Sequence, residues 1–105
     1  MATKTVAIET VKQFLAQCKQ QLPFHIDRAI LFGSTATDTA THLSDIDLAL
    51  FSSSFTDNIL ANIDLYGKVN IHFPDIDVHA YPTEQYQRDS MMMDQIRSTG
   101  IEIRA

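Results

Sequence analysis

The feature that most constrains this chain is a pair of aspartates inside an apolar run, Asp45 and Asp47 in "SDIDLALF". Alternation over residues 45–51 predicts a strand that carries both carboxylates on one face and aliphatic side chains on the other. Two like charges on one face repel each other, and each loses hydration if the sheet is covered. A cation between them relieves both costs, and an all-oxygen ligand set selects Mg²⁺ or Mn²⁺.

A second acidic alternation follows in "DIDVHAYP", where Asp75, Asp77 and His79 alternate with apolar residues. It predicts another strand, which Pro82 ends. If the two strands are neighbours, three or four carboxylates meet in one patch. Three acids are the usual requirement for two divalent ions that assist a phosphoryl or nucleotidyl transfer. His79 shares the acidic face, where it could tune Asp77 or meet a substrate, or simply be an exposed strand residue.

A Gly-Ser pair follows the apolar run of residues 29–32, which predicts a buried strand that ends at Gly33. Because glycine has no side chain, a phosphate can approach the backbone of Gly33 closely. Ser34 adds a hydroxyl and a backbone N–H. A helical turn starting at Thr35 would present free N–H groups to an anion. The pattern therefore predicts a phosphate-binding loop beside the acids.

The remaining elements complete an α+β pattern. An apolar stripe predicts a helix over residues 6–21, stopped by Pro23, with Cys18 as a buried structural thiol. Further helices are predicted after a cap at Thr56–Asp57, from Thr83 to Arg88, and over 91–99 before Gly100, while 68–74 is ambiguous and 101–104 suits a short strand. We expect one domain over residues 1–105, a small sheet packed against helices.

Composition excludes several classes. The net charge of −5, with its eight basic residues scattered, argues against a nucleic-acid groove. No segment has the apolar length of a signal peptide core or a membrane span, so we expect a cytoplasmic protein. The four histidines, among them His42 in the predicted phosphate loop, lack the paired spacing of a zinc site. Met91–Met93 predicts a helix start with one or two buried members, or else an adaptable partner surface.

The segment "GSTATDTATHLSDID", residues 33–47, resembles the G-S-x10-D-x-D signature of the polymerase-beta-like nucleotidyltransferase superfamily. In its short length the chain resembles the minimal members of this superfamily, the MNT proteins, which are paired with HEPN-domain partners. The resemblance implies the polymerase-beta-like fold, with Gly33 and Ser34 binding the nucleotide triphosphate. Asp45 and Asp47 would be ligands to two Mg²⁺ ions. Asp77, rather than Asp75, would be the third carboxylate and the general base.

The same resemblance implies an activity and a partner. Members of the superfamily transfer a nucleoside monophosphate, usually AMP from ATP, to an acceptor hydroxyl. In MNT and HEPN pairs the acceptor can be a tyrosine of the HEPN toxin, so that the MNT protein is the antitoxin in a hetero-oligomer. An enzyme acting on small molecules is a weaker alternative, since 105 residues leave no room for a substrate domain.

One departure from the family pattern supports a different reading. Many members carry an arginine four residues after the motif glycine, whereas this chain has Thr37 followed by Asp38. Loss of a cation near the phosphates would weaken nucleotide binding or slow transfer. The alternative hypothesis is therefore a catalytically weak or inactive antitoxin that neutralises its partner by binding alone.

Overall fold

A mixed sheet of order β3-β2-β1-β4 lies at the centre of the structure, a computed structural model that describes residues 3–36 and 45–104. β1 is antiparallel to both β2 and β4, whereas β2 and β3 run parallel. This arrangement confirms the predicted α+β class with a small mixed sheet. The strands are β1 (Arg28–Phe32), β2 (Ile46–Phe51), β3 (Ile76–Tyr81) and β4 (Ile101–Glu102).

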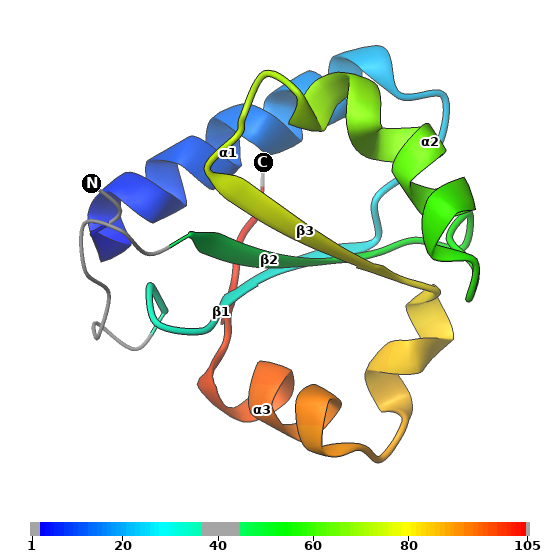
Figure 1. Ribbon diagram of the computed structural model, residues 1–105. Helices are drawn as coiled ribbons and strands as arrows, with labels where there is room; N and C mark the ends of the chain where they lie inside the picture. The colour runs from blue at the N-terminus through cyan, green and yellow to red at the C-terminus, as the bar shows by residue number, and fades with distance from the viewer. Residues whose placement is uncertain (1–2, 37–44, 105) are drawn as a thin grey trace.

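One face of the sheet is covered by two helices, α1 (Lys4–Gln21) and α2 (Ile59–Asn70) (Figure 1). The side chains of β2 that point to this face are buried in an apolar cluster with α1, whose Val11 and Phe14 are fully buried. Cys18 belongs to the same cluster, as predicted for a structural thiol. Apolar burial of this kind is the main stabilising contribution to a fold. The residues that β2 contributes to this apolar cluster are Ile46, Leu48 and Leu50.

The opposite face is covered only in part, by the 3₁₀-helix η1 (Thr83–Gln87) and the helix α3 (Met91–Thr99) (Figure 1). Met93 and Ile96 of α3 pack there against Ala49 and Phe51 of β2. Burial on this face falls towards the start of β2, where the Asp47 side chain is 32% exposed while Ala49 is fully buried. The cover of this face therefore ends before it reaches the acidic residues.

Several predicted boundaries need correction. The first helix begins at Lys4, with Thr3 as its N-cap. The cap of α2 is Asn58, whose side chain accepts from the Ala61 N–H, and not the predicted Thr56–Asp57 pair. α2 also covers the first part of the ambiguous segment 68–74, as far as Asn70, and Val69 of this part is buried in the core.

The segment after Pro82 is also corrected. It forms the 3₁₀-helix η1 and not an α-helix, and its last turn ends at Gln87. α3 then starts separately, with the Ser90 hydroxyl accepting from the Met93 N–H. The closing strand β4 is shorter than predicted and covers Ile101–Glu102.

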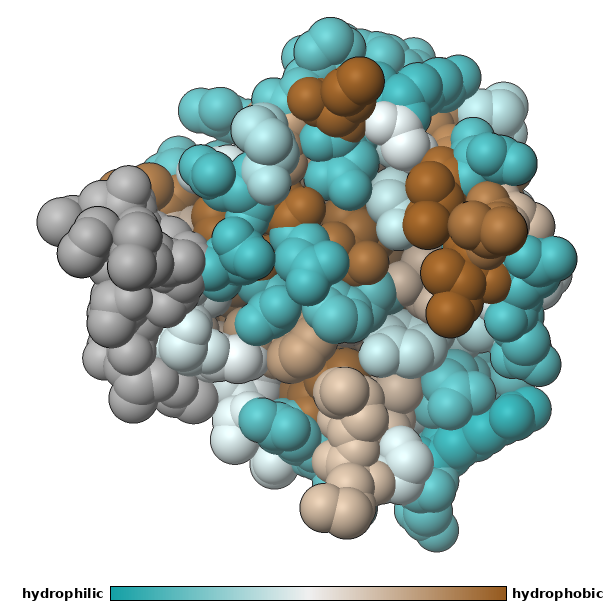
Figure 2. Space-filling model, viewed as in Figure 1, coloured by the Kyte–Doolittle hydropathy of each residue, from teal (hydrophilic) through white to brown (hydrophobic). Residues whose placement is uncertain are grey.

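Apolar side chains remain exposed on the outside of α2. Ile59 and Leu60 are 73% and 74% exposed, and Ile63 is 41% exposed. Figure 2 shows apolar surface gathered over this helix. Met91 is likewise exposed while Met93 is buried, which confirms a helix start with a buried member. Within the described part of the chain, no helix has the length and apolar character needed to cross a membrane.

Candidate active site

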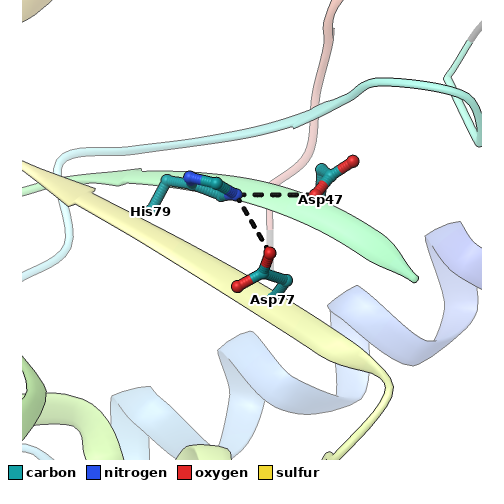
Figure 3. Close-up of side chains that lie close together, drawn as sticks. All are labelled: Asp47, Asp77 and His79. Carbon is teal, nitrogen blue, oxygen red and sulfur yellow. Dashed lines mark ion pairs between the residues drawn. The ribbon is translucent and has the colours of Figure 1, made fainter.

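Asp47 and Asp77 face each other at the start of the parallel pair β2 and β3. They are register partners, and both side chains project from the face that α3 covers only in part (Figure 3). The Asp77 side chain is 58% exposed and the Asp47 side chain 32% exposed. Two carboxylates from separate strands thus meet where ligands can reach them.

His79 lies two residues beyond Asp77 on the same face of β3. Its Nε2 lies 3.5 Å from Asp47 Oδ1 and 3.4 Å from Asp77 Oδ2 (Figure 3). These contacts are ion-pair distances rather than good hydrogen bonds, since N–H···O bonds normally measure 2.7–3.2 Å. Accordingly, Nε2 is shielded from solvent and has no hydrogen-bond partner among the described residues. The sequence placed His79 on the acidic face but did not predict that it joins both acids.

The pKa of Asp47 is raised above its ordinary value of 3.8, mainly because burial removes water from the carboxylate. His79 opposes this rise, and the negative charges of Asp77 and Asp45 add to it. The ionised form of Asp47 is thus held in an unfavourable environment. A bound cation would relieve that cost.

Gly33 lies directly against Asp47, because Phe32 and Asp47 are register partners in the antiparallel pair β1 and β2. Gly33 has a φ of 78°, and a Cβ on this residue would lie 2.5 Å from Asp47 Oδ2. Only glycine fits both this backbone conformation and this close approach. The turn is closed by a bond from the Ala36 N–H to the Gly33 carbonyl, and Ser34 lies within this turn, next in the chain to Gly33.

One of the three predicted acids, Asp45, lies outside the cluster, as does Asp75, which is not the predicted third carboxylate. Asp45 precedes β2, is exposed, and does not join the group that Asp47 and Asp77 form with His79, although its charge reaches Asp47. Asp75 precedes β3, and its carbonyl accepts from the Ile46 N–H. Thr37 and His42 fall outside the described residues.

The donor set suits a divalent cation. One ligand atom from each of Asp47, Asp77 and His79 lies within 4.8 Å of the other two. Carboxylate oxygens and an imidazole nitrogen are established ligands of divalent metals. The buried Nε2 of His79 lies near both carboxylates but makes no hydrogen bond among the described residues, and a bound ion would satisfy such an atom.

A pocket of about 410 Å³ lies elsewhere in the molecule, beside α1, β1 and the end of the chain. Cys18, Arg28 and Glu102 are among its lining residues, and none of the acids discussed above contributes to it. Burial raises the pKa of the Cys18 thiol to about 12, which leaves it protonated and unreactive at neutral pH. The Cys18 thiol is therefore not a candidate nucleophile in this pocket, and the candidate site remains the aspartates.

A mixed sheet with a Gly-Ser turn against one of two neighbouring aspartates is the arrangement expected of a nucleotidyltransferase domain. Residues 11–100 match the family model described as "Nucleotidyltransferase domain". The chain belongs to this family. No curated protein sequence matches it.

Solved structures share the fold. A candidate nucleotidyltransferase from Sulfolobus solfataricus is 14% identical, with a TM-score of 0.70 over 94% of this chain and 80% of that chain. A toxin-antitoxin complex with AMP-PNP is 21% identical, with a TM-score of 0.59 over 90% and 70%. The complex of a tri-AMPylated Shewanella oneidensis HEPN toxin with its MNT antitoxin is 19% identical, with a TM-score of 0.53 over 95% and 71%.

Proposed function

We propose that this protein is a cytoplasmic, Mg²⁺-dependent nucleotidyltransferase that transfers AMP from ATP to a tyrosine hydroxyl of a HEPN-type toxin and thereby acts as its antitoxin. The observation that carries the proposal is the facing pair Asp47 and Asp77 against the Gly33 turn. The similar complexes that contain AMP-PNP or a tri-AMPylated HEPN toxin support the choice of nucleotide and partner.

Each residue has a role in this proposal. Asp47 and Asp77, with Asp45 at the edge of the site, hold two Mg²⁺ ions. When bound, the ions neutralise charge on the attacking and leaving oxygens. Gly33 and Ser34 bind the triphosphate through a backbone that a phosphate can approach closely.

The reaction is an in-line displacement at the α-phosphorus of ATP. The acceptor oxygen forms a bond to this phosphorus while the bond to the bridging oxygen of the β-phosphate breaks, and pyrophosphate leaves. Asp77 takes the proton of the acceptor hydroxyl as general base. Its side chain is 58% exposed, so a hydroxyl carried by another protein can reach it.

The surface of the molecule supports a protein partner. Ile59, Leu60 and Ile63 form an exposed apolar group on α2 (Figure 2). Contiguous exposed apolar surface of this kind commonly marks a protein interface. A hetero-oligomer would cover it.

The test is to co-purify the protein with the product of its neighbouring gene and to add Mg²⁺ and ATP labelled at the α-phosphate. We expect label on the partner with the wild type and none with Asp45→Asn. Asp64→Asn is the matched control, because Asp64 is exposed on α2, outside the acidic cluster. Label that survives Asp45→Asn would remove Asp45 from the proposed metal site.

The second candidate is an antitoxin that neutralises by binding alone. It is favoured by Thr37, which replaces the arginine of the family pattern, and by His79, which already places a basic group beside the acids. The same assay separates the two candidates. A wild-type protein that silences its partner and leaves it unlabelled supports binding alone and contradicts transfer.

A further inference from the structure

We propose that His79 is a metal ligand beside Asp47 and Asp77, and that this nitrogen donor raises the affinity of the site for Mn²⁺ more than its affinity for Mg²⁺. The inference rests on the proposed function, because it assigns the two aspartates to a metal. It goes beyond that proposal by adding a nitrogen ligand to the proposed carboxylates and by naming the ion whose binding this ligand strengthens most.

The first argument is the spacing of the donor atoms. Nε2 of His79 lies 3.5 Å from Asp47 Oδ1 and 3.4 Å from Asp77 Oδ2. Two ligand atoms that are each about 2.1 Å from one ion lie about 3.0–3.4 Å apart at octahedral or tetrahedral angles. Nε2 of His79 is therefore separated from each carboxylate oxygen as two ligands of a common ion are, within a few tenths of an ångström, and the ligand atoms of all three side chains lie within 4.8 Å of one another.

The second argument is that the imidazole is held in position. Ala49 is the register partner of His79 on β2, and its small side chain leaves room for the ring. The edge of Phe32 contacts the ring, with centroids 5.1 Å apart. Nε2 is consequently directed towards the acids, buried, and without a hydrogen-bond partner among the described residues (Figure 3).

The third argument concerns the preference of the ion. Mg²⁺ takes oxygen ligands almost exclusively and keeps several waters. First-row transition ions accept imidazole nitrogen as well as carboxylate oxygen. A site of two aspartates and one histidine thus loses little Mg²⁺ affinity when the histidine is removed, but it loses a real ligand for Mn²⁺.

The experiment uses the full chain with Mn²⁺ alone. Pulsed electron paramagnetic resonance of the Mn²⁺-loaded wild type is expected to show coupling to an imidazole ¹⁴N, and His79→Gln is expected to abolish that coupling. Competition titrations should show Mn²⁺ affinity falling about 10-fold in His79→Gln, with Mg²⁺ affinity changed less than about 3-fold. His72→Gln is the matched control, because His72 is exposed and is not part of the cluster.

The possible failures are distinguishable. Mn²⁺ bound to the wild type without ¹⁴N coupling overturns the role of His79 and leaves the proposed transferase standing. An equal loss of Mn²⁺ and Mg²⁺ affinity in His79→Gln overturns the stated preference. A wild type that binds neither ion overturns both proposals. The ¹⁴N measurement on the wild type requires no variant, so a failure of His79→Gln to fold does not prevent the test.

Discussion

The two faces of the β2–β3 pair differ although the same two strands form both. On the face covered by α1 and α2, alternate positions such as Leu48 and Leu50 are fully buried. On the other face, Asp47 and Asp77 lie beyond the cover that α3 and η1 provide. Because strand side chains alternate, a step of one residue separates a position that stabilises the fold from one that is available for chemistry.

On the acidic face, the surroundings of Asp47 are electrostatically unfavourable and conformationally constrained. Partial burial raises its pKa, and no lysine or arginine forms an ion pair with it among the described residues. Gly33 is held in a left-handed conformation against the same carboxylate. Unfavourable electrostatics and a constrained turn thus meet at one point, which is typical of functional sites.

The strongest test of the difference between the buried face and the acidic face of β2 is Asp47→Asn. We expect AMP transfer to the partner to fall on the order of 10³-fold, equivalent to about 4 kcal/mol, because a metal ligand is removed. The free energy of unfolding should stay equal or rise, since a poorly hydrated charge is removed as well. Initial rates of label transfer and urea denaturation measure the two effects. A variant that loses activity only because it unfolds would contradict this separation.

The next variant alters the adjacent residue on the other face. Leu48→Ala should lower the free energy of unfolding by about 3 kcal/mol, because it opens a cavity in the core. The transfer rate per folded molecule should be retained. Leu60→Ala is the matched control, because Leu60 is 74% exposed and its truncation should cost less than about 0.5 kcal/mol. Similar losses in the two variants would show that Leu48 is not packed as the structure indicates.

Local patterns predicted the alternation of β2 and β3 and the turn at Gly33, because each depends on residues close in the chain. The parallel pairing that sets Asp77 opposite Asp47 depends on contacts between distant segments, so it could be stated only as a condition. His79 was placed on the correct face, but its approach to both acids requires that same pairing.

Asp45 and the start of α2 show the limits of local signals. Asp45 fits the alternation of a strand, yet β2 begins one residue later, at Ile46. Any of three consecutive residues, Thr56, Asp57 and Asn58, is of a type that can cap a helix. Asn58 is the N-cap because α2 begins at Ile59. The roles of Asp45, Asp47, Asp77, Gly33 and Ser34 stay predictions until they are tested in solution.

Substitutions at Gly33 and Gly67 compare a constrained turn beside the acids with an ordinary helix position. Gly33→Ala should cost about 1–2 kcal/mol of stability, because L-residues are strained at a φ of 78°. It should also lower metal affinity, since the new Cβ displaces the Asp47 carboxylate. Gly67→Ala is the control, because its nearest neighbour would be 3.7 Å away within α2. It should stabilise the protein by about 0.5–1 kcal/mol, and equal effects of the two substitutions would contradict the constrained turn.

The smallest expected effect is a pH dependence of the stability difference between wild type and Asp47→Asn, measured by urea denaturation with a chelator present. The folded-state pKa of Asp47 is raised above 3.8, so the folded protein holds this proton more tightly than the unfolded chain does. The stability contributed by the protonated carboxyl is full below 3.8 and is lost as the pH rises through the raised value. The advantage of Asp47→Asn should therefore grow above pH 3.8 and then level off. An advantage that shrinks as the pH rises would mean that His79 dominates over desolvation at this carboxylate.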